Sequence, residues 1–258
     1  MCRLAAYLGP SILLEQFLLQ PPHNLIKQSW APEEMEEAVL NADGFGIGWY
    51  INEKQPCTYL NTQPAWADIN LQSLSLSISS SLWLANVRSA TPGQMTGLSN
   101  TQPFISGNLI YMHNGFINNF NTGIRQRFHE YLSPEIQAGI SGNTDSEYIF
   151  ALFREHLQKN ARDFPRLFKI TIESLAEIIK GETALLNIII SDGSCIYALR
   201  HAFDKKSPSL YYTNNDKQFN GASLIASERM TLDDNWQTVP EHSLVILSTE
   251  KQPEVLKL

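Results

Sequence analysis

Cysteine is scarce in this chain of 258 residues. The three cysteines, Cys2, Cys57 and Cys195, are too far apart for a disulfide framework or a Cys-x-x-Cys metal site. We therefore expect a protein of the reducing cytoplasm. Basic side chains are also few, since 19 Lys and Arg stand against 26 Asp and Glu, which gives a formal charge of −7. A surface that binds phosphates needs positive charge, so the composition argues against nucleic acid as a partner.

Long apolar runs are missing as well. The run after the start ends at Pro10 and the next is interrupted by Glu15, which argues against a signal peptide, and no stretch approaches the roughly 18 residues of a membrane span. Hydrophobic residues nevertheless make up 43% of the chain and charged residues only 17%, enough for a substantial core. We expect a soluble protein without a membrane partner. No linker or internal repeat is visible, and we predict a single domain over residues 1–258.

The periodicity of apolar residues predicts an α+β fold in which strands at both ends of the sequence bracket a helical middle. Residues 3–8 read as a strand ended by Gly9-Pro10, followed by a helix from Ser11 to residue 19, and the next twenty residues read as an irregular excursion. Residues 71–81 fit a strand or a helix. The further strands are expected at residues 43–51, 57–61, 82–87, 109–112, 184–191, 195–200, 210–213, 222–226 and 243–247, and the further helices at 120–132, 145–159 and 167–180.

Cys2 is the first candidate for chemistry. Removal of Met1 would leave a thiol and a free amine on one residue, with ordinary pKa values of about 8.5 and 7.7–8.0. The amine can then take the thiol proton near neutral pH, so nucleophile and base are combined. The alternative for a cysteine here is a small apolar residue that opens a strand.

Polar residues after two predicted strands supply further candidates. Asn114-Gly115 offers a side-chain amide and a backbone N–H, the donors of an oxyanion hole, although Asn-Gly also favours a hairpin turn. Arg88 with Thr91 can bind a carboxylate, or Arg88 can form a surface ion pair. Asp145 can accept an ammonium group, or stabilise the start of the helix that Thr144 is predicted to cap.

Other residues favour plainer interpretations. His113 lies beside the proposed oxyanion hole, but we expect a neutral imidazole in the core. Gly44, Gly46 and Gly48 lack the order of a phosphate-binding loop, and we interpret them as permitting close backbone approach beneath the site. Neither Cys57 nor Cys195 has partners at metal-ligand spacing. We therefore expect neither a metal nor a cofactor.

Taken in order, these motifs resemble the class II glutamine amidotransferases, a family of N-terminal-nucleophile hydrolases. They are the leading Met-Cys, Ala42 to Trp49, Arg88-Ser89-Ala90-Thr91, His113-Asn114-Gly115 and Thr144-Asp145-Ser146-Glu147. Further segments are similar to the stand-alone amidohydrolases of ergothioneine biosynthesis, which remove glutamate from a γ-glutamyl cysteine-sulfoxide conjugate of trimethylhistidine. These segments are residues 1–10, Pro21-Pro22-His23, Gln28-Ser29, Ser191-Asp192-Gly193, Ala226-Ser227-Glu228 and Val239-Pro240.

The resemblance implies a four-layer αββα sandwich of two antiparallel sheets covered by helices. It places the nucleophile at Cys2, the oxyanion hole at Asn114 and Gly115, the carboxylate-binding pair at Arg88 and Thr91, and the acceptor of the α-amino group at Asp145. Pro92 and Gln102 stand where aminosugar-forming members carry histidines, and this affects the finer substrate contacts.

The implied reaction is hydrolysis of a γ-glutamyl amide, such as glutamine or γ-glutamyl-hercynylcysteine sulfoxide, through a thioester on Cys2. Because no synthase domain is recognised in these 258 residues, plain hydrolysis is expected. The alternatives are an ammonia-supplying subunit of a separate synthase, and a catalytically silent scaffold of the same fold. The expected partner is a small γ-glutamyl compound. Assembly as a homo-oligomer and removal of Met1 stay open at this point.

Overall fold

Two antiparallel sheets form the middle of the molecule in the computed structural model, which describes residues 2–34, 40–52, 55–90 and 96–258. The first sheet has the order β11 (Gln237–Thr238), β9 (Tyr211–Asp216), β10 (Ala222–Ala226), β1 (Arg3–Leu13), β4 (Ser79–Val87), β2 (Phe45–Ile51) and β3 (Gln55–Asn61). The second has the order β13 (Glu254–Lys257), β12 (Ser243–Ser248), β8 (Cys195–Phe203), β7 (Ala184–Ser191), β6 (Leu109–Ile117) and β5 (Phe104–Ser106). The N-terminal strand β1 is thus an inner strand of its sheet.

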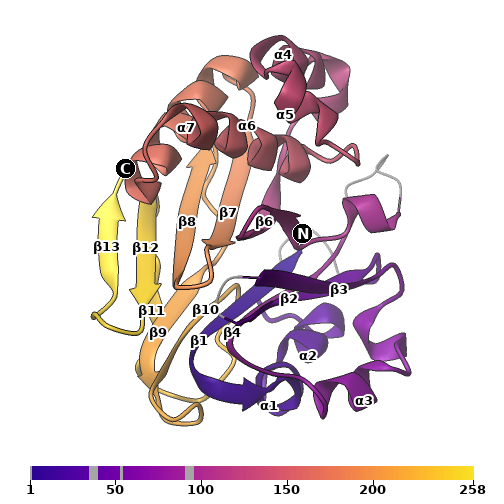
Figure 1. Ribbon diagram of the computed structural model, residues 1–258, viewed down its shortest axis with the longest axis vertical. Coiled ribbons are helices and arrows are strands. Elements are labelled where there is room, and N and C mark those ends of the chain that lie inside the picture. The colour runs from indigo at the N-terminus through magenta and orange to yellow at the C-terminus, as the bar shows by residue number, and fades with distance from the viewer. Residues whose placement is uncertain (1, 35–39, 53–54, 91–95) are drawn as a thin grey trace.

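Helices cover the outer faces of both sheets, so the four layers of the predicted αββα sandwich are confirmed (Figure 1). Over the first sheet lie α1 (Leu14–Leu18), α2 (Leu25–Trp30) and α3 (Leu71–Ser75). Over the second lie α4 (Arg125–Tyr131), α5 (Pro134–Ala138), α6 (Asp145–Lys159) and α7 (Phe164–Ile179). Within the described ranges, no helix is both long and apolar enough to cross a membrane.

Three clusters of buried side chains hold the layers together. Two fill the space between a sheet and its helices, and the third lies between the two sheets. Because side chains alternate along a strand, β1 sends Leu4 and Ala6 into the space between the sheets, and β6 sends Ile110 and Met112 into it from the other side. Burial of both faces explains why these strands read as nearly continuous apolar runs.

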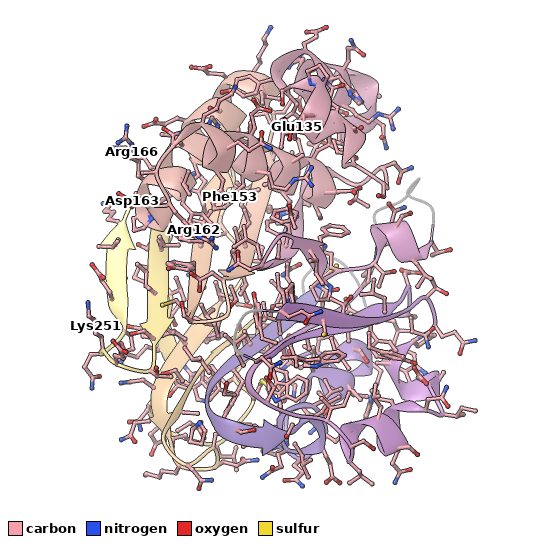
Figure 2. All side chains as sticks on the ribbon, in the orientation of Figure 1. Glu135, Phe153, Arg162, Asp163, Arg166 and Lys251 are labelled. Carbon is pink, nitrogen blue, oxygen red and sulfur yellow. The ribbon has the colours of Figure 1, made fainter. Side chains whose placement is uncertain are left out.

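Local side-chain contacts fix the residue at which α7 begins (Figure 2). Asp163 caps the helix by accepting a hydrogen bond from the backbone N–H of Arg166 at 3.2 Å. Arg162 donates to Asn108 at 2.8 Å, while Phe164 stacks on Tyr197 with ring centroids 4.1 Å apart. The helix therefore begins three residues before the predicted 167.

Two predictions for the first hundred residues need correction, and one open alternative is decided. Strand β1 does not end at Gly9-Pro10; a shift in register between Leu8 and Ile12 takes it past the proline, and helix α1 starts only at Leu14. The predicted irregular excursion contains α2, whose cap Asn24 accepts from the N–H of Lys27 at 2.9 Å. The ambiguous residues 71–81 hold both alternatives, because α3 ends at Ser75 and β4 begins at Ser79.

The helical middle follows the prediction closely. Helix α6 has the predicted bounds, and the Thr144 side chain accepts from the N–H of Glu147 at 3.3 Å, as expected for its cap. The helix predicted at residues 120–132 is interrupted, because Gly123 has a positive φ of 122° and Thr122 also leaves the helical region. Strands β7 and β10 also have the predicted bounds.

Candidate active site

Cys2 directly precedes β1, the strand that begins at Arg3 in the first sheet (Figure 1). It is partly buried, and its thiol lies 3.8 Å from the carbonyl oxygen of Ser89. The alternation that directs Leu4 and Ala6 between the sheets directs the Cys2 side chain there as well. Strand β1, which follows Cys2, contacts β6, the strand that carries Asn114.

Asn114 and Gly115 lie inside β6, which runs to Ile117. We predicted a strand that ended at residue 112 and a polar cluster after it, and that boundary is wrong. The pairing of β6 with β7 continues without a break from Ile110 to Ile117, which also excludes a hairpin turn at Asn114-Gly115. Residues that are paired in this way cannot form a tight turn, so the turn interpretation of Asn114-Gly115 is wrong.

The Asn114 amide is fully buried, and neither its Nδ2 nor its Oδ1 has a hydrogen-bond partner among the described residues. The side chain follows Ile110 and Met112 on the face between the sheets. A buried amide without partners costs about 1–3 kcal/mol, and most such groups in folded proteins are satisfied. This amide is therefore ready to bond an incoming polar group.

The N–H of Gly115 points to the open edge of β6, beyond the end of its short pairing with β5. On this edge the N–H of His113 donates to the side chain of Gln102, and the N–H of Ile117 donates to Asp145 Oδ2 at 2.8 Å. Alternate residues of a strand direct their N–H groups to the same side, so the Gly115 donor lies between these two. A Cβ on Gly115 would lie 1.7 Å from the Leu185 carbonyl oxygen, so a side chain cannot fit.

Arg88 follows β4 and is 3% exposed. The pairing of Arg3 with Val87 places Arg88 beside Cys2. Backbone bonds hold it there, because its N–H donates to the Gly44 carbonyl at 2.8 Å and its own carbonyl accepts from Asp43 at 3.0 Å. The Asp43 carboxylate in turn accepts from the N–H of Ala90 at 2.8 Å. Thr91, predicted to assist Arg88, lies outside the described residues.

Asp145 begins α6 and is 4% exposed. Its carboxylate accepts from the backbone N–H groups of Ile117 at 2.8 Å and of Ser146 at 2.9 Å. It thus occupies a helix start, which is the plainer interpretation, and also contacts the strand that carries Gly115. Asp145 therefore lies beside β6. Arg88 lies beside Cys2, the residue that precedes β1.

His113 points away from Cys2, into the layer between the second sheet and its helices. Its Nδ1 lies 2.8 Å from Ser146 Oγ and its Nε2 lies 3.0 Å from the Leu185 carbonyl oxygen. Burial lowers the pKa of His113, although the charge of Asp145 works in the other direction. The position of His113 in the core agrees with our expectation, and its imidazole bonds Ser146 and Leu185 on the helix-covered side of β6.

Gly44, Gly46 and Gly48 permit the close approach that we predicted, and Gly46 and Gly48 lie in β2. A Cβ on Gly46 would lie 2.2 Å from the Gln102 carbonyl oxygen, and one on Gly48 would lie 3.0 Å from Ile110. Side chains at either position would separate the two sheets. Gln102 was noted in the sequence only as a departure from the histidine of other members. The structure shows that its amide bonds both the N–H and the carbonyl of His113, next to the Asn114-Gly115 pair.

Sequence reasoning also missed Asn86 in β4. It is 1% exposed, its amide has no partner among the described residues, and it lies two positions before Arg88 on the same face. A polar residue in the apolar run 82–87 is the signal that could have identified it. Among the described residues, no group of three or more His, Cys, Asp or Glu side chains could hold a metal ion.

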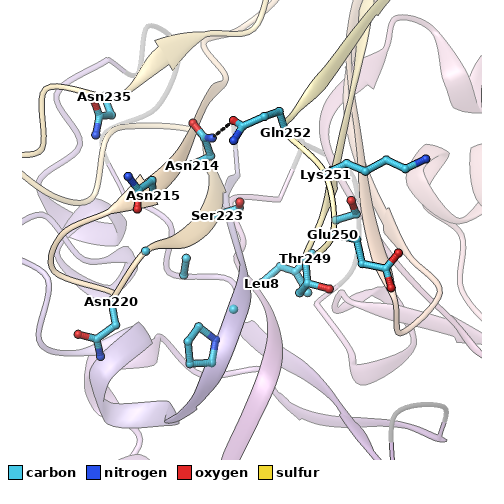
Figure 3. Close-up of a pocket in the computed structure, with 15 residues that line it drawn as sticks. Leu8, Asn214, Asn215, Asn220, Ser223, Asn235, Thr249, Glu250, Lys251 and Gln252 are labelled. Carbon is cyan, nitrogen blue, oxygen red and sulfur yellow. Dashed lines mark hydrogen bonds between the residues drawn. The ribbon is translucent and has the colours of Figure 1, made fainter.

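A groove of about 990 Å³ lies elsewhere, beside the middle of β1 (Figure 3). It is lined by the bend at Leu8, Gly9 and Pro10, by the β9–β10 hairpin and by the turn before β13. Asn214 and Gln252 form a hydrogen bond of 2.6 Å across it. None of the predicted site residues lines this groove.

Comparison with known proteins gives one consistent family. A family model for class II glutamine amidotransferases matches residues 28–254. A probable glutamine amidotransferase of Saccharomyces cerevisiae is 30% identical over 302 aligned positions, which cover 99% of this chain and 84% of the yeast protein.

A second relative is the gamma-glutamyl-hercynylcysteine sulfoxide hydrolase of Mycolicibacterium smegmatis, 28% identical over 95% of both chains. Among solved structures, a class II glutamine aminotransferase domain protein of Silicibacter pomeroyi superposes with a TM-score of 0.74 at 23% identity, over 99% of both chains. This last likeness concerns the fold.

Proposed function

The chain belongs to the class II glutamine amidotransferases, a family of enzymes with N-terminal-nucleophile amidohydrolase activity, and we propose that it hydrolyses γ-glutamyl amides with Cys2 as nucleophile. The observation that carries this proposal is the pair of donors on β6. The buried Asn114 amide has no partner among the described residues, and the Gly115 N–H faces the open strand edge. Two such donors opposite a cysteine suit a developing oxyanion.

The reaction begins once Met1 has been removed. The Cys2 amine takes the thiol proton, the sulfur attacks the γ-carbonyl carbon, and Asn114 and Gly115 stabilise the negative oxygen. Collapse of this intermediate expels the amine of the substrate, which receives the proton from the Cys2 ammonium group. Water then attacks the γ-glutamyl thioester, with the same amine as base, and releases glutamate and the free thiol.

Specificity for the glutamyl group rests on two opposite charges. Arg88 suits the α-carboxylate because its planar guanidinium can donate two parallel hydrogen bonds, and Thr91 is expected to assist. Asp145 suits the α-ammonium. Both side chains are almost fully buried, so each of them attracts an opposite charge on the ligand more strongly than an exposed side chain would.

We expect the leaving group to be more than ammonia. The Mycolicibacterium smegmatis relative is named for a γ-glutamyl conjugate, γ-glutamyl-hercynylcysteine sulfoxide, and the likeness covers 95% of each chain. This supports hydrolysis of a γ-glutamyl conjugate. We further propose that the chain acts alone in the cytoplasm, with residues 1–258 as one amidotransferase domain.

The test is a panel of γ-glutamyl compounds incubated with the purified chain alone, with glutamate release as the readout. The panel contains glutamine, simple γ-glutamyl amines and γ-glutamyl-hercynylcysteine sulfoxide. Fast turnover of a conjugate supports the proposal. Glutamine turnover that requires an added synthase would instead identify an ammonia-supplying subunit. No turnover and no alkylation of Cys2 by diazo-oxo-norleucine would identify a silent scaffold.

A further inference from the structure

Three segments that resemble the ergothioneine-pathway amidohydrolases have no part in the chemistry described so far, and all three meet at one place. His23, Gln28 and Glu228, one from each of these segments, are joined by hydrogen bonds. Glu228 in turn pairs with Arg3, the residue directly after the proposed nucleophile. Arg3 is 1% exposed, and its Nε lies 2.8 Å from Oε1 of the equally buried Glu228. A buried ion pair therefore adjoins Cys2.

The Glu228 carboxylate is held from several sides. His23 Nε2 lies 2.7 Å from Oε2, and the backbone N–H groups of Glu33 and Glu34 donate at 2.9 and 3.1 Å. Burial opposes the charged form, but the hydrogen bond from His23, the two backbone donors and the Arg3 charge outweigh it and lower the pKa of Glu228 to about 2. Glu228 is thus a fixed anion.

The backbone around Arg3 is fixed as well. The N–H of Leu4 donates to Ser227 Oγ at 3.0 Å, and the N–H of Ser227 donates to the Leu4 carbonyl at 2.9 Å. Arg3 Nη1 donates to the carbonyl oxygen of Cys2 at 3.1 Å. Ser227, which follows β10, therefore fixes the first residues of β1. The Arg3 guanidinium bonds the backbone of Cys2.

We propose that Arg3, held by Glu228, is a positioning residue for Cys2, which rests on the proposed function of Cys2 as an N-terminal nucleophile. The amine and the thiol both branch from the Cys2 Cα. A bond to the Cys2 carbonyl oxygen fixes the torsion about the Cα–C bond, and so fixes where amine and sulfur lie relative to β6. The first residue of a chain otherwise frays, and small misplacements of a nucleophile are costly.

Stability alone is a weak reason for this arrangement. Buried ion pairs are often no more stabilising than apolar side chains of similar volume. The chain also offers a matched control in Arg200, which is 7% exposed and donates to the carbonyl oxygens of Pro208 at 2.8 Å, Val239 at 2.8 Å and Ser207 at 3.1 Å. Arg200 is a buried arginine that holds backbone carbonyls, but it lies in β8, two strands away from Asn114 and in the other sheet from Arg3.

The experiment compares Arg3→Lys and Glu228→Gln with Arg200→Lys in the full chain. Glutamine hydrolysis gives kcat and KM, and diazo-oxo-norleucine at saturation gives the rate of Cys2 alkylation. We expect both cluster variants to lose about tenfold to a hundredfold in kcat and in alkylation rate, with KM little changed, since a misplaced nucleophile slows the step after binding. Arg200→Lys should lower Tm and leave both rates near those of the wild type.

Unchanged kcat and alkylation rates in the cluster variants would overturn the positioning role, and so would an equal loss in Arg200→Lys. If Arg3→Lys or Glu228→Gln does not fold, His23→Ala at the rim of the cluster replaces it. His23→Ala removes one hydrogen-bond donor to Glu228. The positioning role then predicts that His23→Ala lowers kcat as described for the other two variants and leaves KM unchanged. A wild type that neither hydrolyses γ-glutamyl compounds nor is alkylated at Cys2 would overturn the proposed function itself.

Discussion

Replacement of Asn114 by alanine separates catalysis from stability, because this amide bonds nothing among the described residues. In the free protein it is fully buried with both polar atoms unpartnered. Asn114→Ala removes an unsatisfied group that costs about 1–3 kcal/mol and leaves a small cavity with a cost of its own. These opposing effects should leave Tm near the wild-type value or above it.

Catalysis should respond very differently. Loss of one donor from an oxyanion hole costs about 2.7–4 kcal/mol of transition-state stabilisation, which is about a hundredfold to a thousandfold in kcat. KM should change little, since the donor acts on charge that develops after binding. The expected variant is therefore folded, binds its substrate and turns over very slowly.

Asn187 is a matched control for this variant. It lies directly opposite Asn114 in β7 and is also fully buried, but its Nδ2 donates to the Ser209 carbonyl at 2.9 Å. Asn187→Ala should lower Tm by removing this bond and keep kcat close to that of the wild type.

The assay combines steady-state glutamate release with calorimetric unfolding for both variants. Our reasoning would be refuted if Asn114→Ala kept its kcat. It would also be refuted if Asn114→Ala lost as much Tm as Asn187→Ala, because the amide would then have a structural partner.

Four further outcomes are expected. Arg88→Lys should raise KM for glutamine sharply, because an ammonium group cannot form the planar pair of bonds to a carboxylate, and steady-state kinetics will detect it. Gly115→Ala should destabilise the fold by at least about 1–3 kcal/mol in urea unfolding, since its Cβ would lie 1.7 Å from the Leu185 oxygen. The lowered pKa of Glu228, about 2 against the ordinary 4.5, stabilises the fold above pH 4.5, and this contribution disappears as the pH falls through 2. Glu228→Gln should therefore unfold more easily than the wild type at neutral pH, with a difference that shrinks in acid. Mass spectrometry of active enzyme should show Cys2 as the first residue, and intact Met1 on fully active protein would disprove the amine as base.

The sequence by itself determined most of the helices, the strands and the layer arrangement. Strand β7 and helix α6 could be predicted to the residue, because continuous apolar burial, a capping threonine and the 3.6-residue period are local signals. The residue types at Cys2, Arg88, Asn114 and Asp145 also stood out, since their order resembles that of a known family.

Tertiary structure decided what local signals cannot encode. Asn114-Gly115 has the composition of a turn, yet it lies inside β6, because pairing with β7 and the close Leu185 carbonyl outweigh the turn preference. In the same way β1 continues past Pro10, where a shift in register accommodates the proline.

The arrangement around Cys2 depends on contacts between residues far apart in the chain. Arg3 meets Glu228 across 225 positions, and the open edge of β6 is defined by the bonds of Gln102 and Asp145 to its N–H groups. Long-range burial and hydrogen bonding leave no periodic trace in the sequence. The candidate residues could therefore be named from the sequence, while the direction of each donor was decided only by the packing of the two sheets.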